Sequence, residues 1–287
     1  MISSFKIIDV AELSTQQVLS VINAAFGRNE SAAWFDWKHR EGPWGPSIGI
    51  AAVDQGGPIG VRLLLPWRFR LNGVPVVGHR ATEAATIPRA QGRGVFTALN
   101  RWMMEEVQTE LIFSTPNMQS RVGYIKLGWR EIARVPHRWE LAVRPQGSAL
   151  IPSILPDALR TDWDMRALKW RSDPRCGHVY QTVFSADAVL YYRTFRRAGM
   201  PVVAPMAALG DSAECAFLWR RMLKQTRALF VLRPVTQAAP QPSTRFAIQR
   251  GESLILGWHA GTGILALARR GVLDTVPWSA ADVEGVI

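Results

Sequence analysis

The chain has 287 residues, of which 48% are hydrophobic, and carries a formal net charge of +11 at pH 7. This length holds one large domain or two of ordinary size, and the apolar share is sufficient for a buried core. The chain has no apolar run of about 18 residues, and it has only two cysteines, Cys176 and Cys215. These features argue against a membrane-spanning helix, a disulfide framework and a Cys-rich metal site.

The positive charge comes from 34 Lys and Arg against 23 Asp and Glu, and only five of the basic residues are lysines. Such a charge attracts anions, including nucleotides and nucleic acids. The basic residues are scattered, however, and an arginine-rich composition alone would give the same result. Because no basic tail or Lys-rich run is present, we expect no nucleic-acid partner.

The first residues, MISSFKIIDVAELS, include acids and lack the long apolar stretch of a signal peptide. Together with the low cysteine content, this favours a cytoplasmic protein, which we expect to be bacterial, without a membrane partner.

Up to residue 87 the patterns predict, in order, a strand, two helices and a three-strand meander. The corresponding ranges are 4–9, 14–26, a helix capped by Ser31 that holds Trp34, Phe35 and Trp37, 48–53, 59–69, and a strand that ends at Ile87. Hairpin turns are predicted at 54–57 and 71–73. The clustered aromatic residues have two interpretations, an aromatic wall for a ligand or ordinary core packing.

The segment from His79 to Trp129 is the most informative part of the chain. A strand-like run over 81–87 ends at Pro88. A glycine-rich turn over 88–94 follows, and a helical pattern starts at Val95. A helix that begins directly after such a turn directs free backbone N–H groups to one point, where an anion can bind.

The turn does not match the common phosphate-binding motifs. It lacks both the G-x-G-x-x-G spacing of dinucleotide sites and the Gly-Lys-Ser/Thr of a P-loop. On its own it could equally be an ordinary tight turn.

Two motifs resemble the GNAT acyltransferase superfamily. Gln91-x-x-Gly94, preceded by Thr86-x-Pro88, is similar to that family's acyl-CoA pyrophosphate loop, with Phe96 in place of its last small residue. Downstream, Asn117-x-x-Ser120-x-x-x-Tyr124-x-x-x-Gly128-Trp129 is similar to a second signature. The resemblance covers residues 1–143.

The resemblance implies acetyl-CoA as cosubstrate. The backbone amides from Gly92 to Thr97 and the charge of Arg93 would hold the pyrophosphate. The strand 83–87 would pair with the pantetheine arm, beside a β-bulge that the sequence does not reveal. The predicted cofactor-binding residues are Ala85, Thr86, Ile87, Gln91, Gly92, Arg93, Gly94, Val95, Phe96, Thr97 and Asn117.

Two residues are candidates for catalysis. Tyr124 would act as general acid toward the CoA sulfur, because its hydroxyl is a donor at neutral pH. Glu83, the only acid between Asp54 and Glu105, would act as general base. Tyr124 could instead be a core residue, Glu83 a surface carboxylate on the opposite strand face, and Asn117 a simple helix cap.

After a strand over 131–142, residues 144–158 are rich in Pro and Ser and suggest an interdomain linker. We therefore expect a GNAT-like domain over 1–143 and a second domain over 159–287. In the second half, strands are predicted at 179–184, 189–194, 202–207, 228–233, 246–249, 254–259 and 264–268, with a helix that Ser212 caps. Trp170 and the residues around it repeat the pattern at Trp37, which suggests a divergent second GNAT-like half that does not bind CoA.

The fold class expected for the whole chain is α/β, with mixed α+β sheets. The predicted function is a CoA-dependent N-acyltransferase that moves an acetyl or short acyl group directly to an amine. The alternative is a non-catalytic protein on the same fold that binds acyl-CoA or a partner. The five histidines are scattered, so no metal is expected. The acceptor and the oligomeric state are left open.

Overall fold

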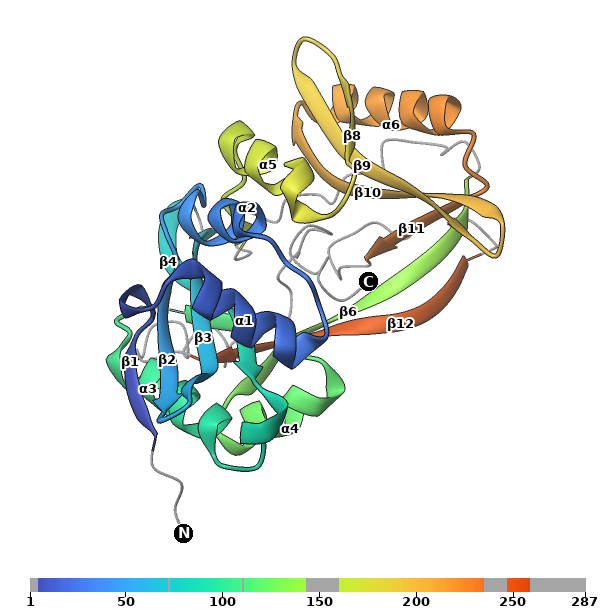
Figure 1. Cartoon of the computed structure of the whole chain (residues 1–287). Helices are drawn as coiled ribbons and strands as arrows, with labels where there is room; N and C mark the ends of the chain where they lie inside the picture. Colours follow the sequence, from blue (N-terminus) through green and yellow to red (C-terminus); the bar gives the residue numbers. More distant parts are fainter. Residues whose placement is uncertain (1–4, 72, 110, 143–159, 235–246, 259–287) are drawn as a thin grey trace. The chain divides into compact units, whose positions relative to one another are not determined.

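The computed structural model describes residues 5–71, 73–109, 111–142, 160–234 and 247–258 (Figure 1). The chain divides into two compact units, which are described separately. The first comprises Met1–Arg68, Val76–Glu131 and Leu256–Leu265, and the second comprises Phe69–Pro75, Ile132–Ile255 and Ala266–Ile287. The predicted linker at 144–158 lies outside the described residues, and the domain boundaries stay a prediction.

The elements from the N-terminus to residue 126 follow the predicted order. They are β1 (Lys6–Asp9), η1 (Val10–Glu12), α1 (Thr15–Phe26), α2 (Ala32–Phe35), η2 (Asp36–Arg40), β2 (Ile48–Asp54), β3 (Gly57–Leu71), β4 (Val74–Thr86), η3 (Pro88–Ala90), α3 (Val95–Glu106), β5 (Leu111–Ser114) and α4 (Met118–Lys126). Three short helical elements were not predicted: the 3-10 helices η1 and η3, and η2, a π-helix that continues α2. Such π turns are rare and often occur at functional sites.

Local signals explain where the first two helices begin. Ser14 and Gln17 form a capping box at the start of α1, and Gly27 ends that helix in a left-handed conformation. The predicted cap Ser31 accepts a bond from the Trp34 amide at 3.2 Å and starts α2.

The sheet of the first unit has the order β1-β2-β3-β4-β5, with residues 256–258 of β12 beside β5. β1 and β2 pair antiparallel, as do β2 and β3. β4 and β5 pair in parallel across the α3 crossover. The cluster that includes Ile59, Val95 and Leu99 buries one face of this sheet against α3.

β5 accompanies only part of β4, because β4 extends beyond the end of β5. Gly78 lies opposite Leu111, and Arg80 lies opposite Phe113. Because β5 ends at Ser114, residues 82–86 of β4 continue beyond the end of their neighbour. This leaves one edge of β4 without β5 on the approach to Pro88.

The second unit contains most of β6 (Arg130–Leu141) and the elements that follow it. They are β7 (Arg160–Thr161), α5 (Met165–Arg171), η4 (Pro174–Cys176), β8 (Gln181–Phe184), β9 (Ala188–Arg197), β10 (Met200–Gly210), α6 (Ser212–Thr226), β11 (Phe230–Pro234) and β12 (Ala247–Trp258). A core cluster that includes Leu218, Trp219 and Met222 of α6 packs on β9 and β10.

The second unit repeats the strand arrangement of the first. β8, β9 and β10 are successive antiparallel neighbours, and β10 pairs in parallel with β11 across α6. The same sequence of strand, strand, strand, helix and parallel strand runs from β2 to β5. The mixed α/β class is thus confirmed, and this order is compatible with two GNAT-like halves.

Two details of the second half differ from the sequence-based expectation. The cap of α6 is Asp211 and not Ser212, because the Asp211 carboxylate accepts bonds from the Ala213 and Glu214 amides at 2.9 and 3.1 Å. The strands predicted at 246–249 and 254–259 are one strand, β12. The strand predicted at 264–268 lies outside the described residues.

Candidate functional site

The start of α3 differs from the start of every other described α-helix. Its N-cap residue is Gly94, with φ of 82°, and no side chain bonds to the first-turn amides. The other five α-helices each have a side-chain cap: Ser14, Ser31, Asn117, Asp164 and Asp211. The first N–H groups of α3 are therefore left for an external acceptor.

The turn before α3 has the shape that the sequence predicted. Pro88–Ala90 forms a short 3-10 turn, and Gly92 and Gly94 both have left-handed φ values, 76° and 82°. A Cβ atom built on either glycine would meet nothing within 4 Å, so the backbone here faces open space. A ligand can therefore approach the backbone closely at Gly92 and Gly94.

Two arginines beside this turn share one carboxylate. Arg89 Nη1 and Arg93 Nη1 each lie 3.1 Å from Asp54 Oδ2. The hydrogen bond from Arg89, with a further one from Arg93, holds the pKa of Asp54 at about 2. Asp54 is therefore ionised at neutral pH and offsets one of the two positive charges. Arg93 was expected from the sequence, whereas Arg89 and Asp54 were not.

The strand residues before the turn are packed from one side. Ala85 is buried, and the Ile87 amide donates to the Ile59 carbonyl at 3.0 Å. Ala85 and Thr86 belong to the part of β4 that extends beyond β5. A free strand edge of this kind can pair with an extended ligand.

Glu83 interrupts β4 locally. Its φ of 44° is left-handed, although the residue lies inside a strand and is not glycine. This conformation costs a non-glycine residue about 1–2 kcal/mol. Strain of this kind persists where neighbouring contacts hold it, and it is frequent at functional sites.

The contact that holds Glu83 is an ion pair with Lys38 of the π-helix. Lys38 Nζ lies 2.6 Å from Glu83 Oε1, and the two side chains are 22% and 5% exposed. Lys38 Nζ also lies 4.8 Å from the centre of the Trp34 ring, within the range of a cation–π contact. Glu83 is thus a buried, ion-paired residue and not a surface carboxylate.

His39 completes this cluster. Its Nε2 lies 4.0 Å from Glu83 Oε1, and its Nδ1 lies 2.9 Å from Ser47 Oγ. Burial lowers the pKa of His39 to about 3, so the ring is neutral at pH 7. Burial alone would raise the pKa of Glu83, but the charge of Lys38 and the smaller effects of His39 and of hydrogen bonds hold it at about 2. Paired in this way, Glu83 is a weak base.

Tyr124 lies on the buried face of α4. Its side chain is 2% exposed, and its ring contacts Trp129, with centroids 4.6 Å apart. The Arg62 guanidinium lies 5.3 Å from the ring centre. Arg62 is itself buried, and its Nε and Nη2 atoms have no hydrogen-bond partner among the described residues. Its Nη1 donates to the Thr82 carbonyl at 3.3 Å. Tyr124 is thus a packed residue whose ring lies beside a buried, partly hydrogen-bonded cation.

Asn117 acts as a helix cap. Its Oδ1 accepts bonds from the Ser120 amide at 2.8 Å and from Ser120 Oγ at 2.9 Å. These bonds start α4 and position the turn that carries Tyr124. The structure therefore supports the capping interpretation, and a direct contact of Asn117 with a cofactor stays a prediction.

The clustered aromatic residues before β2 are core residues. Trp34, Phe35 and Trp37 are all buried. Phe35 and Trp34 pack against the His39 ring, at centroid distances of 4.9 and 5.7 Å. Burial favours core packing over an exposed wall, although the Trp34 ring also contacts Lys38.

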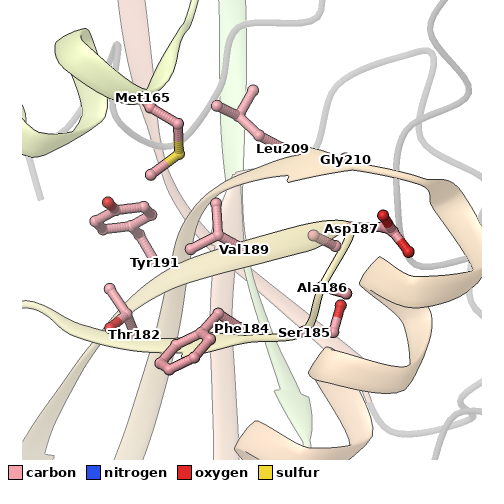
Figure 2. Close-up of a pocket in the computed structure, with 11 residues that line it drawn as sticks. Met165, Thr182, Phe184, Ser185, Ala186, Asp187, Val189, Tyr191, Leu209 and Gly210 are labelled. Carbon is pink, nitrogen blue, oxygen red and sulfur yellow. The ribbon is translucent and has the colours of Figure 1, made fainter.

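The second unit has a cavity of about 520 Å³ that the sequence did not predict. Its lining comes from α5, from the hairpin of β8 and β9, and from the end of β10 (Figure 2). Met165, Val189 and Leu209 make most of it apolar, and Ser185 and Asp187 add polar groups at the hairpin turn. No predicted site residue lies in this cavity.

Residues 6–132 match the model of the acetyltransferase (GNAT) domain. This segment has the GNAT fold. It includes the uncapped start of α3, the β4 edge, Glu83 and Tyr124.

Solved structures with the same fold are distant in sequence. A GCN5-related N-acetyltransferase from Anabaena variabilis is 12% identical with a TM-score of 0.67, and the match covers 88% of this chain and 72% of that one. A probable N-acyltransferase from Enterococcus faecalis V583 is 11% identical with a TM-score of 0.68, over 89% and 73%. Eis1 from Mycobacterium abscessus is 13% identical with a TM-score of 0.62, over 88% and 73%. No curated protein matches the sequence significantly. These similarities show the fold.

Three further observations concern the rest of the chemistry. Within the described ranges, no group of three His, Cys, Asp or Glu residues could hold a metal ion. No helix in the part of the chain that the structure describes is long and apolar enough to cross a membrane. Neither Cys176 nor Cys215 is part of a disulfide.

Proposed function

We propose that the protein is a CoA-dependent N-acyltransferase that transfers an acetyl or short acyl group from acyl-CoA to an amine. The observation that carries this proposal is the uncapped N-terminus of α3, which lies beside two arginines. It follows the end of β4, where one edge of that strand extends beyond β5. The first N–H groups of a helix bind the pyrophosphate of a nucleotide, and a strand edge pairs with the pantetheine arm.

The proposed reaction is direct transfer. The amine nitrogen attacks the thioester carbonyl, a C–N bond forms, and the C–S bond breaks. Tyr124 gives a proton to the departing sulfur, and the amine proton passes to a water molecule that Glu83 orients. Because Glu83 is ion-paired with a pKa of about 2, it would act mainly by orienting that water.

A second candidate function is acyl-CoA binding without catalysis. Two observations favour it: the depressed pKa of Glu83 and the burial of Tyr124. The two candidates share the CoA site and differ in turnover. The low cysteine content suits a reducing compartment, and we propose that the protein acts in the cytoplasm.

The CoA site is tested by titration calorimetry with CoA and acetyl-CoA. Gly94→Glu places a carboxylate beside the pyrophosphate and should abolish binding. Gly177→Glu is a matched control, because Gly177 has φ of 80° against 82° for Gly94, and a Cβ at either meets nothing within 4 Å. Absence of CoA binding by the parent at millimolar concentration, or equal binding by both variants, would refute the site.

Turnover separates the two candidate functions. The parent protein is incubated with acetyl-CoA and a broad panel of primary amines, and release of the free thiol is followed. Thiol release that depends on an amine supports the enzyme. CoA binding without thiol release on any amine supports the binding protein.

A further inference from the structure

The feature that goes beyond the proposed reaction is the contact between the π-helix and the irregular point in β4. Glu83 is the one described non-glycine residue within a strand of the first unit that has a positive φ. It lies where β4 loses β5 as a neighbour, three residues before Thr86. The direction of the free edge therefore depends on the backbone at Glu83.

We propose that Lys38 is a positioning residue that holds β4 in the conformation needed for CoA binding. Its ammonium bonds to Glu83 at 2.6 Å, whereas the His39 ring lies 4.0 Å from the same carboxylate and is neutral. A left-handed glutamate is unfavourable by itself, so the ion pair maintains it. Without Lys38, the buried carboxylate has no cation, and β4 relaxes toward a regular strand.

The position of Lys38 is itself constrained. The Trp34 ring lies below its ammonium at 4.8 Å, and the π-helix turns the side chain toward β4. A π turn shifts the residues after it relative to an α-helix, so the register that directs Lys38 inward depends on the turn. The π-helix thus helps to shape the proposed CoA site, which itself lies on β4 and the start of α3.

The test uses CoA affinity and a rescue by glycine. Lys38→Met keeps the length of the side chain and removes its charge, and we expect CoA to bind roughly tenfold more weakly. Glycine adopts a positive φ without steric cost, so Glu83→Gly should bind CoA like the parent. The double variant K38M/E83G should recover most of the affinity that K38M loses.

Arg40→Met is the matched control. Arg40 belongs to the same π-helix and also combines an ion pair, with Asp36, and an aromatic contact, with Phe35. Its loss removes the same charge from the same element and should leave CoA affinity unchanged. A K38M protein that is folded by circular dichroism and binds CoA like the parent overturns the proposal, as does a double variant no better than K38M.

The functional readout rests on the proposed CoA site, so a second readout keeps the two questions separate. Amide hydrogen exchange over residues 80–87 reports on β4 without ligand. Faster exchange in K38M, reversed in K38M/E83G, supports the positioning role even if the parent binds no CoA. Equal exchange in the parent and K38M overturns it. If K38M fails to fold, a folded double variant supports the role, and an unfolded one counts against it.

Discussion

Phe96 of α3 packs edge-on against Tyr124 of α4, with ring centroids 5.4 Å apart and an interplanar angle of 76°. The contact passes over Gly123, where an added Cβ would lie 2.7 Å from Phe96 Cε1. This explains why a phenylalanine occupies a position where the GNAT loop usually has a small residue. The small residue at this contact is Gly123 of α4, which leaves room for the Phe96 ring.

The first prediction follows from this contact. Gly123→Ala in a helix interior would ordinarily stabilise by about 1 kcal/mol. Here the methyl group collides with the Phe96 ring, and overpacking of this kind costs about 1–3 kcal/mol. We therefore expect a lower melting temperature. In the background of Phe96→Leu, the same substitution should be neutral or stabilising, which a double-mutant cycle measures. An additive cycle would show that the two residues do not interact.

The second prediction concerns acid stability and His39. The folded pKa of His39 is about 3, below its ordinary value of 6.5, so the unfolded chain binds the proton more readily. The contribution of His39 to the free energy of unfolding is thus fully present above pH 6.5 and is lost progressively as the pH decreases toward 3. Between pH 7 and pH 5 we expect a loss of roughly 1–2 kcal/mol from this residue.

His39→Phe removes that contribution and keeps a ring between Trp34 and Phe35. Its melting temperature should change less between pH 7 and pH 5 than that of the parent. The carboxylates titrate at lower pH, and the variant retains His79 and His137, so the difference isolates His39. An identical pH dependence in both proteins would mean that His39 is not neutral in the folded state.

The third prediction concerns charge at the α3 turn. Asp54→Asn removes the carboxylate that Arg89 and Arg93 share. The site gains one net positive charge, so CoA should bind more tightly at low ionic strength, with a steeper decrease as salt is added. Titration at two salt concentrations measures this. Asp173→Asn makes the same change beside Arg175 in the second unit and should have no effect on binding. Weaker binding by D54N would mean that the ion pairs are needed to order the turn.

Local features of the site could be predicted from the sequence because they depend on neighbouring residues. Pro88 stops a strand, Gly92 and Gly94 permit the turn, and the periodicity from Val95 defines α3. Even the missing cap follows, since Gly94 has no side chain to accept a bond. The confirmed order of strands and helices rests on the same kind of information.

The ion pairs of the site could not be predicted in this way. Lys38 and Glu83 are 45 residues apart, and Arg93 and Asp54 are 39 apart. Whether such residues meet depends on strand register and on the π turn, which shift side chains from one face to another. The alternation of β4 left the face of Glu83 open for the same reason, because its left-handed backbone interrupts the alternation.

The last prediction concerns Tyr124 and decides whether the phenol takes part in chemistry. Tyr124→Phe keeps the ring contacts with Phe96, Trp129 and Arg62 and removes only the hydroxyl. We expect CoA affinity and melting temperature close to those of the parent, and kcat lower by about 10²–10⁴-fold, the usual contribution of a general acid. Steady-state kinetics on an amine that the parent acetylates gives the value. Tyr124→Ala is the comparison, since it also removes the packing and should lower the melting temperature. Unchanged kcat in Tyr124→Phe would assign the buried ring to the core alone and transfer protonation of the sulfur to water.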